Sequence, residues 1–220
     1  MIRGPELFSL TEEAEMKRTK SRASPGKKAV PGKSRPRPGR AARGAGAPRA
    51  RRRKPAGLSG RKRQYLERFA SELERTLRVL DAFPPGRDDF KPHERSGTAV
   101  RVAHTFIKEN GAVVRAARGE WTLQPNVPPP PATVAEARET YARGARELME
   151  AVRDMPESRL DEAVTFFTGP GTTGPVRIHD MLWFMLLDSV HHRGQLSVYV
   201  RMAGGKVPSI YGPSADEPWR

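Results

Sequence analysis

The stretch LLDSVHHRGQLSVYVRMAGG, from Leu186 to Gly205, combines an apolar helical pattern with a stripe of polar side chains. At 100° per residue, Asp188, His192, Gln195 and Tyr199 fall within about 60° of one another on one side of the helix. Apolar residues occupy the opposite side and continue the stripe toward the N-terminus, so the helix is apolar all round, and we expect it to be buried with its polar stripe facing inward. Such groups must pair with each other or bind an ion, because unpaired burial of each costs several kcal/mol.

Two further helices are expected upstream, where the periodicity is helical. Apolar residues at spacings of three and four begin after Gly60 and predict a first helix, which Pro84 and Pro85 end. A second helix is expected from about 97 to 118 and carries its apolar face on Val100, His104, Ile107 and Gly111. The proline run at 128–131 then forces an extended connection.

The C-terminal half of the chain predicts two more helices. Thr133 suits the N-cap of a third helix that ends near Asp154. Residues 158–174 are expected to form a loop with one short extended piece. Pro175 suits the first turn of the fourth helix, and the glycines after Ala203 suit its C-terminal end.

Four helices of roughly 20 residues joined by loops predict an all-α fold, an antiparallel four-helix bundle with a long crossover. This domain is expected to span residues 60–220. Residues 1–60 hold 17 Lys and Arg against 4 Asp and Glu, a net charge of +13, with almost no large apolar residue after residue 17. Residues 1–59 are therefore expected to form a disordered basic tail.

The composition also limits the chemistry and the compartment. The chain has no cysteine, which excludes disulfides, thiolate metal ligands and a protein thiol nucleophile. No apolar run approaches the roughly 20 residues that span a bilayer, and the N-terminus lacks the apolar core of a secretory signal. We expect a cytoplasmic protein with no membrane partner.

The polar stripe contains a candidate metal site. Asp188 and His192 stand at positions i and i+4, which face the same point on the helix surface. A third ligand has to come from another helix, and His104 is the candidate. Two histidines and one carboxylate leave coordination positions open, as in a catalytic metal site, and zinc, nickel or iron would fit. Gln195 and Tyr199 could hydrogen-bond a ligand or a bound water.

A structural alternative explains the same residues. Aspartate and histidine at this spacing often form an ordinary ion pair, and a histidine on an apolar helix face is often a core residue with a satisfied hydrogen bond. In that case Asp188 and His192 pair with each other, and His104 has no role in binding.

Two segments resemble a known family. MLWFMLLDSVHHRGQLSVYVRMAGGKVPSIYGPSADE, residues 181–217, resembles the last helix and C-terminal tail of the DinB-like family of metal-binding four-helix bundles, which is unrelated to the DNA polymerase of that name. VAHTF, residues 102–106, resembles the motif that carries the family's second-helix histidine. The resemblance extends from Gly60 to Glu217 and leaves the basic tail outside.

The resemblance implies a ligand set of one histidine from the second helix and an HxxxH pair on the last. By motif position these residues are His104 and His192, and Asp188 stands where the family most often has the first histidine of the pair. A carboxylate can serve there as an oxygen ligand. His191 is the alternative third ligand if Asp188 does not bind the metal directly.

The resemblance also implies a function and partners. It indicates a metal-dependent enzyme in which a divalent ion activates water or a low-molecular-weight thiol for transfer to a small electrophile. The absence of cysteine is consistent with an external thiol. Paired bundles in the family imply a homodimer. The alternative is a non-catalytic metal-binding or stress-response protein whose basic tail associates with nucleic acid without sequence specificity.

Overall fold

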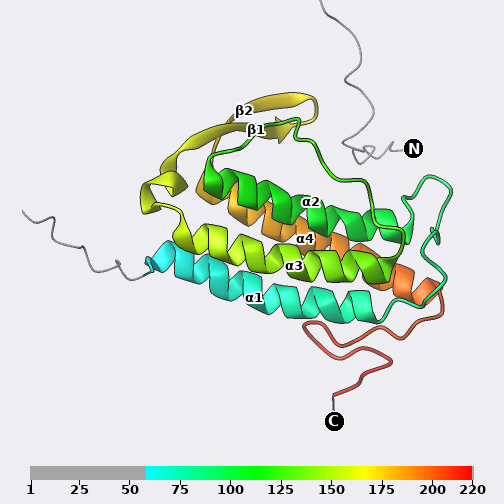
Figure 1. Cartoon of the computed structure of the whole chain (residues 1–220). Helices are drawn as coiled ribbons and strands as arrows, with labels where there is room; N and C mark the ends of the chain where they lie inside the picture. Colours follow the sequence, from blue (N-terminus) through cyan, green and yellow to red (C-terminus); the bar gives the residue numbers. More distant parts are fainter. Residues whose placement is uncertain (1–57, 220) are drawn as a thin grey trace, which may run out of the picture. The chain divides into compact units, whose positions relative to one another are not determined.

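The structure of the chain, a computed structural model, describes residues 58–219 (Figure 1). The expected disorder of the basic tail concerns residues that lie almost entirely outside this range. The described part is mostly helical, as predicted, with four long helices, one short 3-10 helix and one two-stranded sheet. The elements are α1 (Gly60–Asp81), α2 (Ala99–Arg118), α3 (Val134–Asp154), η1 (Glu157–Asp161), β1 (Ala163–Gly169), β2 (Thr172–Arg177) and α4 (Ile178–Met202).

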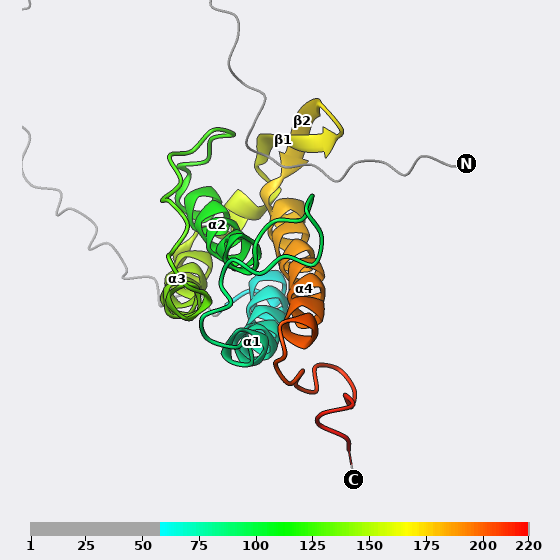
Figure 2. The same cartoon turned by 90° about the vertical axis from the view of Figure 1, so that its right-hand side faces the viewer.

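The four long helices lie side by side. Each of α1 and α2 contacts both α3 and α4, so the helices surround a common core. Helices α1 and α4 run in one direction, and α2 and α3 run in the opposite direction (Figures 1 and 2). The segment 119–133 returns along the bundle from the end of α2 to the start of α3, which is the long connection that the proline run requires.

The starts of three helices are fixed by hydroxyl caps. Ser59, Thr98 and Thr133 each have extended backbone angles and accept a hydrogen bond from the backbone N–H three residues later. This arrangement satisfies one of the N–H groups that a helix leaves free at its start. The predicted N-cap at Thr133 and the predicted end of α3 at Asp154 are both confirmed.

The connection between α3 and α4 differs from the prediction. Strands β1 and β2 form an antiparallel hairpin in which Phe166 lies opposite Gly174, and the turn contains Gly171 at φ 67°. Pro175 lies in β2 and not in the first turn of α4, which begins three residues later. Proline is tolerated there because the hairpin has only edge strands. The expected loop with one short extended piece is therefore wrong.

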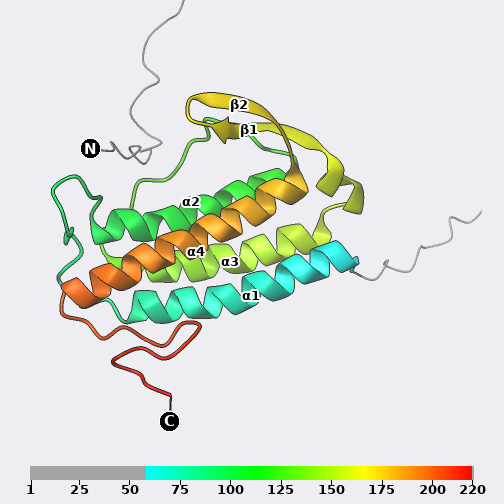
Figure 3. The ribbon, with the colours of Figure 1, turned by 180° about the vertical axis from the view of Figure 1, so that it is seen from behind.

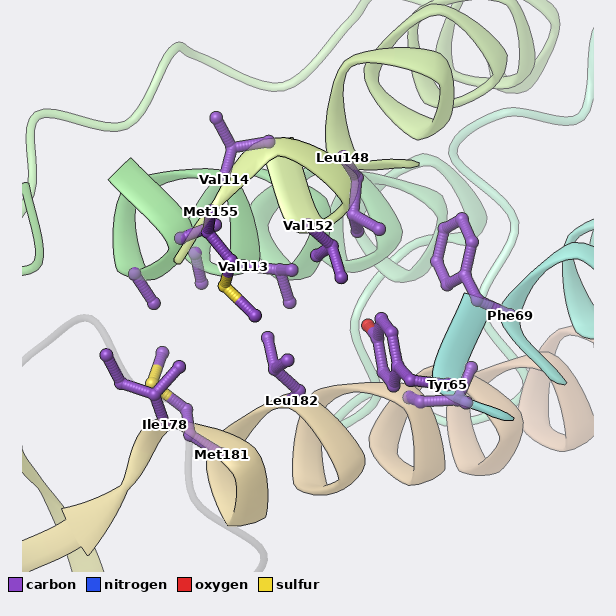
Figure 4. Packing of buried hydrophobic residues seen from close by; sticks show 14 of the residues in the cluster. Tyr65, Phe69, Val113, Val114, Leu148, Val152, Met155, Ile178, Met181 and Leu182 are labelled. Atoms are coloured by element: carbon purple, nitrogen blue, oxygen red, sulfur yellow. The ribbon is translucent and has the colours of Figure 1, made fainter. Parts of the chain in front are cut away.

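The core consists of two apolar clusters along the bundle. One gathers around Tyr65, Val113, Leu148 and Leu182, where side chains from all four helices meet (Figure 4). The second cluster lies at the end of the bundle where α1 and α4 finish and α2 and α3 begin, and it is centred on Phe106, Tyr141 and Leu196. Helix α4 contributes to both clusters, so one of its faces is held firmly against α1 and α2.

The buried face of α2 is only partly the one predicted. The buried positions include Val102, Phe106, Glu109 and Val113. Of the predicted face, His104 is buried, whereas Val100, Ile107 and Gly111 are only partly buried. Five alanines of α2 are buried as well, and these small side chains permit close helix packing. Alanine gives a weak apolar signal, so the sequence pattern assigned the buried face to the larger Val100 and Ile107.

No helix within residues 58–219 is long and apolar enough to cross a bilayer.

Candidate metal centre

Three acidic and imidazole side chains come together between α2 and α4. Glu109 of α2 and Asp188 and His192 of α4 each place a potential ligand atom within 4.8 Å of the others. The Nε2 atom of His192 lies 3.6 Å from Oδ2 of Asp188, at the i,i+4 spacing seen in the sequence. The antiparallel packing of α2 against α4 thus brings a third, distant residue to the predicted pair.

Gln195 orients the imidazole of His192. Its Oε1 atom lies 2.9 Å from Nδ1 of His192 and accepts the hydrogen bond from the protonated Nδ1. The Nε2 atom is then left to face Asp188. A metal-binding histidine commonly has its second nitrogen held in this way, which fixes the ring and its tautomer.

Glu109 is the most deeply buried member of the cluster. Its residue surface is 5% exposed, and Ser189 donates a hydrogen bond to its Oε2 atom, while no donor group within residues 58–219 reaches the buried Oε1 atom. Burial raises the pKa of Glu109 well above its usual range. The charge of Asp188 and a hydrogen bond with its carboxylate add to this rise, and the hydrogen bond from Ser189 opposes it. Among the described residues, the carboxyl group of Glu109 thus has no cationic side chain close enough to form an ion pair and stabilise its ionised form.

In Asp188 and His192, each side chain offsets the effect of burial on the pKa of the other. Burial would raise the pKa of Asp188, but hydrogen bonds with His192 and Glu109 and the charge of His192 lower it. Burial would likewise lower the pKa of His192, but Asp188 and Gln195 raise it. Lys108 also contributes positive charge, although none of the ion pairs in the described part of the chain includes Glu109. The pair therefore leaves Glu109 without a direct counter-ion.

These residues fit a divalent cation. Two carboxylates and one imidazole are oxygen and nitrogen donors of the type that zinc, nickel and ferrous iron accept. A cation at this position would take the place of the proton that burial favours on Glu109 and would use its Oε1 atom as a ligand. Three protein ligands would also leave coordination positions for a substrate.

His104 lies on α2 outside this cluster. It is buried, and its Nε2 atom has no hydrogen-bond partner within the described residues. Burial lowers the pKa of His104, and the positive charges of Lys108 and Arg101 lower it further against a hydrogen bond with the backbone of Pro128. His104 is therefore a neutral imidazole with a free buried nitrogen, and its role as a ligand stays a prediction.

The remaining predicted residues have other contacts. His191 is exposed, and its Nε2 atom lies 2.9 Å from Nε2 of Gln195, so Gln195 bridges the two adjacent histidines. The hydroxyl of Tyr199 donates to the backbone oxygen of Gly97 at 3.2 Å, away from the cluster. Of the residues named from the sequence, Asp188, His192 and Gln195 are thus the ones that lie together.

Sequence reasoning missed Glu109. An acidic residue after Lys108 in a helix has the pattern of a solvated pair, and the misplaced face of α2 put it outside the core. The signal that could have found it is its spacing. Glu109 follows Phe106 by three residues and precedes Val113 by four, so it interrupts an otherwise apolar stripe.

A second polar cluster lies on the α1 side of α4. Arg193 is 1% exposed, and its Nη1 atom donates to Oε2 of Glu72 at 2.8 Å. The hydroxyl of Tyr211 also donates to Oε2 of Glu72, at 2.6 Å. Burial would raise the pKa of Glu72, but the hydrogen bonds from Tyr211 and Arg193 lower it below its usual value. Glu72 thus has its counter-ion, and the bond from Tyr211 ties the C-terminal segment to the bundle.

The sequence matches a family model described as the DinB family over residues 56–219. It is also 29% identical over 154 residues to the uncharacterized protein YrdA of Bacillus subtilis, an alignment that covers 70% of this chain and 89% of that protein. The matched range includes all of the described residues, 58–219.

Two solved structures share the fold. A DinB-like protein from Bacillus cereus matches with a TM-score of 0.56 and 21% identity, covering 68% of this chain and 97% of the other. The DinB-like protein YjoA from Bacillus subtilis matches with a TM-score of 0.53 and 19% identity, covering 65% and 94%. At these identities, the matches concern the arrangement of the helices and not the site residues.

Proposed function

Because this chain belongs to the DinB family, we propose that it is a metal-dependent enzyme whose divalent cation is held by Glu109, Asp188 and His192. The observation that carries the proposal is the buried carboxyl of Glu109, which has an unpartnered oxygen and lies beside two further ligand atoms. A buried carboxylate without a counter-ion is costly, and a bound cation removes that cost.

The side chains around the site would prepare it for a cation. Gln195 keeps the proton of His192 on Nδ1 and leaves Nε2 available. Ser189 holds one oxygen of Glu109, so the other oxygen is available as a ligand. A divalent ion bound here supplies Lewis-acid chemistry, which lowers the pKa of a coordinated water or thiol to near neutrality.

The proposed reaction transfers water or a low-molecular-weight thiol to a small electrophile. The chain has no cysteine, so a thiol nucleophile would have to come from outside the protein. Asp188 and His192 are half-buried and Glu109 is buried, so a substrate would approach from the α4 side of the cluster. Zinc, nickel and iron are the candidate metals.

The metal content of the purified protein tests this proposal. Wild type, Glu109→Gln and His192→Ala are purified without a histidine tag or chelator, and the metals are counted by plasma mass spectrometry. We expect about one zinc, nickel or iron per chain in wild type and a loss of that metal in both variants. His104→Ala is measured alongside and tests whether the predicted family histidine also binds.

His179→Ala is the matched control for His192→Ala. His179 lies on the same helix, contacts Trp183 and Asp180, and is outside the cluster. Wild-type protein that stays free of metal even after incubation with zinc or nickel contradicts the proposal. Equal metal content in Glu109→Gln and wild type contradicts the assignment of Glu109.

A separate proposal concerns the basic N-terminal segment. Its net charge of +13 within residues 1–60 favours non-specific association with nucleic acid by counterion release. A truncated chain that starts at Gly60 should keep its metal and lose salt-sensitive retention on DNA. Equal DNA retention by full-length and truncated chains contradicts this second role.

A further inference from the structure

The outer face of α2, opposite its core side, carries three cationic side chains at seven-residue intervals. Arg101, Lys108 and Arg115 follow one another by two helical turns, so they lie within about 40° on the helix surface. Phe106 and Val113 lie on the opposite, buried side. Figure 3 shows α2 on the side of the bundle nearest the hairpin, next to α4. We call Arg101, Lys108 and Arg115 the α2 cation stripe.

The α2 cation stripe has no acidic partner within residues 58–219. No ion pair in this part of the chain includes any of its three side chains. By contrast, Arg118 at the end of the same helix pairs with Glu147 at 2.8 Å. The one acidic residue of α2, Glu109, lies on the buried side. The field of three such cations on one face favours an anion there.

Arg115 is the member of the stripe whose polar atoms are least satisfied. It is half-buried, and its Nε atom is fully buried with no hydrogen-bond partner among the described residues. Burial alone lowers the pKa of Arg115, with no acidic group to oppose it, although an arginine stays protonated at physiological pH. A buried donor without a partner costs free energy, so this arginine differs from an ordinary solvated one.

Gly111 makes room for the guanidinium of Arg115. A Cβ atom at residue 111 would lie 3.2 Å from Nη1 of Arg115, closer than an ordinary contact. The side chain therefore runs back along α2 over Gly111, in the direction that helical side chains usually take. Lys108 is one turn further in the same direction, about 4.5 Å along the axis. Glycine in a helix interior is destabilising, and the room that it gives to Arg115 supplies a reason for it.

Lys108 connects the stripe with the candidate metal centre. It is half-buried and directly precedes Glu109 in the sequence. Burial is the largest cause of the pKa shifts of Glu109 and His192, and the charge of Lys108 lowers the pKa of both. Burial lowers the pKa of Lys108 itself, against the charges of Glu109 and Asp188. The ammonium group thus lies close enough to the cluster to act on an anionic molecule bound there.

From these features we propose that Arg115 and Lys108 form an oxyanion subsite beside the metal cluster, which binds a carboxylate or phosphate group of a reactant. The planar guanidinium of Arg115 donates two parallel hydrogen bonds to such a group, and the ammonium of Lys108 adds a point charge. The subsite itself needs no metal, whereas its assignment to a reactant rests on the proposed function. It makes at least one reactant of the proposed transfer an anionic molecule.

Thermal unfolding in oxyanion solutions tests the subsite on the full-length, metal-free chain. Tm is measured at pH 8 with increasing sodium phosphate and, separately, with increasing sodium succinate, while sodium chloride keeps the ionic strength constant. We expect a saturating rise in the Tm of wild type. The series with the lower apparent Kd identifies phosphate or carboxylate as the preferred group.

Arg115→Gln should weaken the apparent affinity about tenfold, the value of one charge-assisted hydrogen bond, and Lys108→Gln should weaken it by a smaller factor. Arg118→Gln is the matched control, because Arg118 lies on the same helix and has its own partner in Glu147. It also measures the general stabilisation that phosphate gives as a salt. All variants share the basic N-terminal segment, so a difference between them comes from α2.

Gly111→Glu provides a second, independent variant. It places a carboxylate four residues before Arg115, where it can pair with the guanidinium. We expect a higher Tm than wild type in chloride and no saturating rise with either oxyanion. Circular dichroism should show an unchanged helix content in every variant. A lower Tm in chloride together with an undiminished oxyanion response would count against the proposed position of the guanidinium.

Equal responses of wild type and Arg115→Gln, or no saturating rise of wild type in either series, overturn the proposal. The metal content is measured independently, so the two proposals fail separately. Metal binding without an oxyanion response leaves the proposed function standing and overturns the subsite. An Arg115-dependent response in a chain that binds no metal keeps the oxyanion site and overturns its assignment to a reactant.

Discussion

Adjacent residues of α4 serve two different polar clusters inside the same bundle. His192 turns toward α2 and joins Glu109 and Asp188, whereas Arg193 turns toward α1 and binds Glu72. Each cluster contains one buried glutamate, 5% exposed in both cases. Glu72 has a guanidinium within 2.8 Å, but Glu109 keeps an oxygen without a partner.

The difference separates a structural role from a functional one. A buried charge that is fully paired stabilises one arrangement of the chain and offers nothing to a ligand. A buried carboxyl without a counter-ion costs free energy in the absence of a ligand, and a bound cation recovers that free energy. The pKa shifts have opposite directions for this reason, lowered for Glu72 and raised for Glu109.

The largest effect on stability should come from breaking the pair of Arg193 and Glu72, which we call the paired cluster. Arg193→Ala leaves the carboxylate of Glu72 buried with the hydroxyl of Tyr211 and only the longer ion-pair contacts to Arg68 and Arg75, at 3.7 and 3.8 Å. We expect a loss of about 3 kcal/mol in the free energy of unfolding, the low end for a broken buried pair. Urea denaturation of the metal-free protein measures this loss.

Removing both charges provides the control for Arg193→Ala. A double variant with Glu72→Leu and Arg193→Leu leaves no unpaired charge, and it should lose much less stability than the single variant. A single variant as stable as wild type would show that the pair does not hold α1 to α4.

The next largest effect should be the pH dependence of stability that comes from Glu109 in the candidate metal site. The pKa of Glu109 is raised in the folded state, so above about pH 4.3 the unfolded chain loses a proton that the folded chain keeps. Stability should then fall with rising pH by at most about 1.4 kcal/mol per unit until the folded pKa is reached. Glu109→Gln should remove this fall when unfolding is measured in metal-free buffer from pH 5 to 8.

The paired cluster should show the opposite pH dependence. The pKa of Glu72 is lowered in the folded state, so its stabilisation is complete above the ordinary pKa of glutamate. The stabilisation should be lost as the pH falls through the folded pKa. Compared with Glu72→Gln, wild type should therefore lose stability more steeply below about pH 4.3. Parallel acid unfolding curves for the two proteins would contradict this sign.

The smallest effect is expected at the C-terminal segment. Tyr211→Phe removes one hydroxyl that bonds both Glu72 and Arg193 but keeps the ring beside the guanidinium. We expect a loss of about 2 kcal/mol, about 1 kcal/mol for each of the two hydrogen bonds. Limited proteolysis should also cut the C-terminal segment faster in this variant. An unchanged rate would show that other contacts, such as the Arg78 and Glu217 pair, hold the segment.

Much of the helical fold could be predicted from the sequence because its signals are local. The cap at Thr133 and the prolines at 84 and 85 act on neighbouring residues, and the stripes of α1 and α4 carry large apolar side chains. The hairpin was missed because the turn residues around Pro170 favour a loop when strand pairing is not known. The register of α2 was missed because alanine gives a weak apolar signal.

Of the candidate metal site, Asp188 and His192 could be predicted from the sequence but Glu109 could not, and the reason is different. Asp188 and His192 are one turn apart on the same helix, so spacing alone brings them together. Glu109 is 79 positions before Asp188, and only the packing of α2 against α4 makes it a neighbour. Arg193 and Glu72 are even further apart in sequence, at 121 positions, and their pairing was not predicted for the same reason.

Thermal unfolding with and without zinc tests most directly whether the Glu109 cluster lacks a cation. Metal-free wild type and Glu109→Gln are each unfolded with increasing zinc, and Asp180→Asn serves as an acidic control from the same helix. We predict that zinc raises the Tm of wild type and of Asp180→Asn by ligand linkage and leaves Glu109→Gln unchanged. An equal rise in wild type and Glu109→Gln, or no rise in either, would contradict the assignment of this cluster as the metal site.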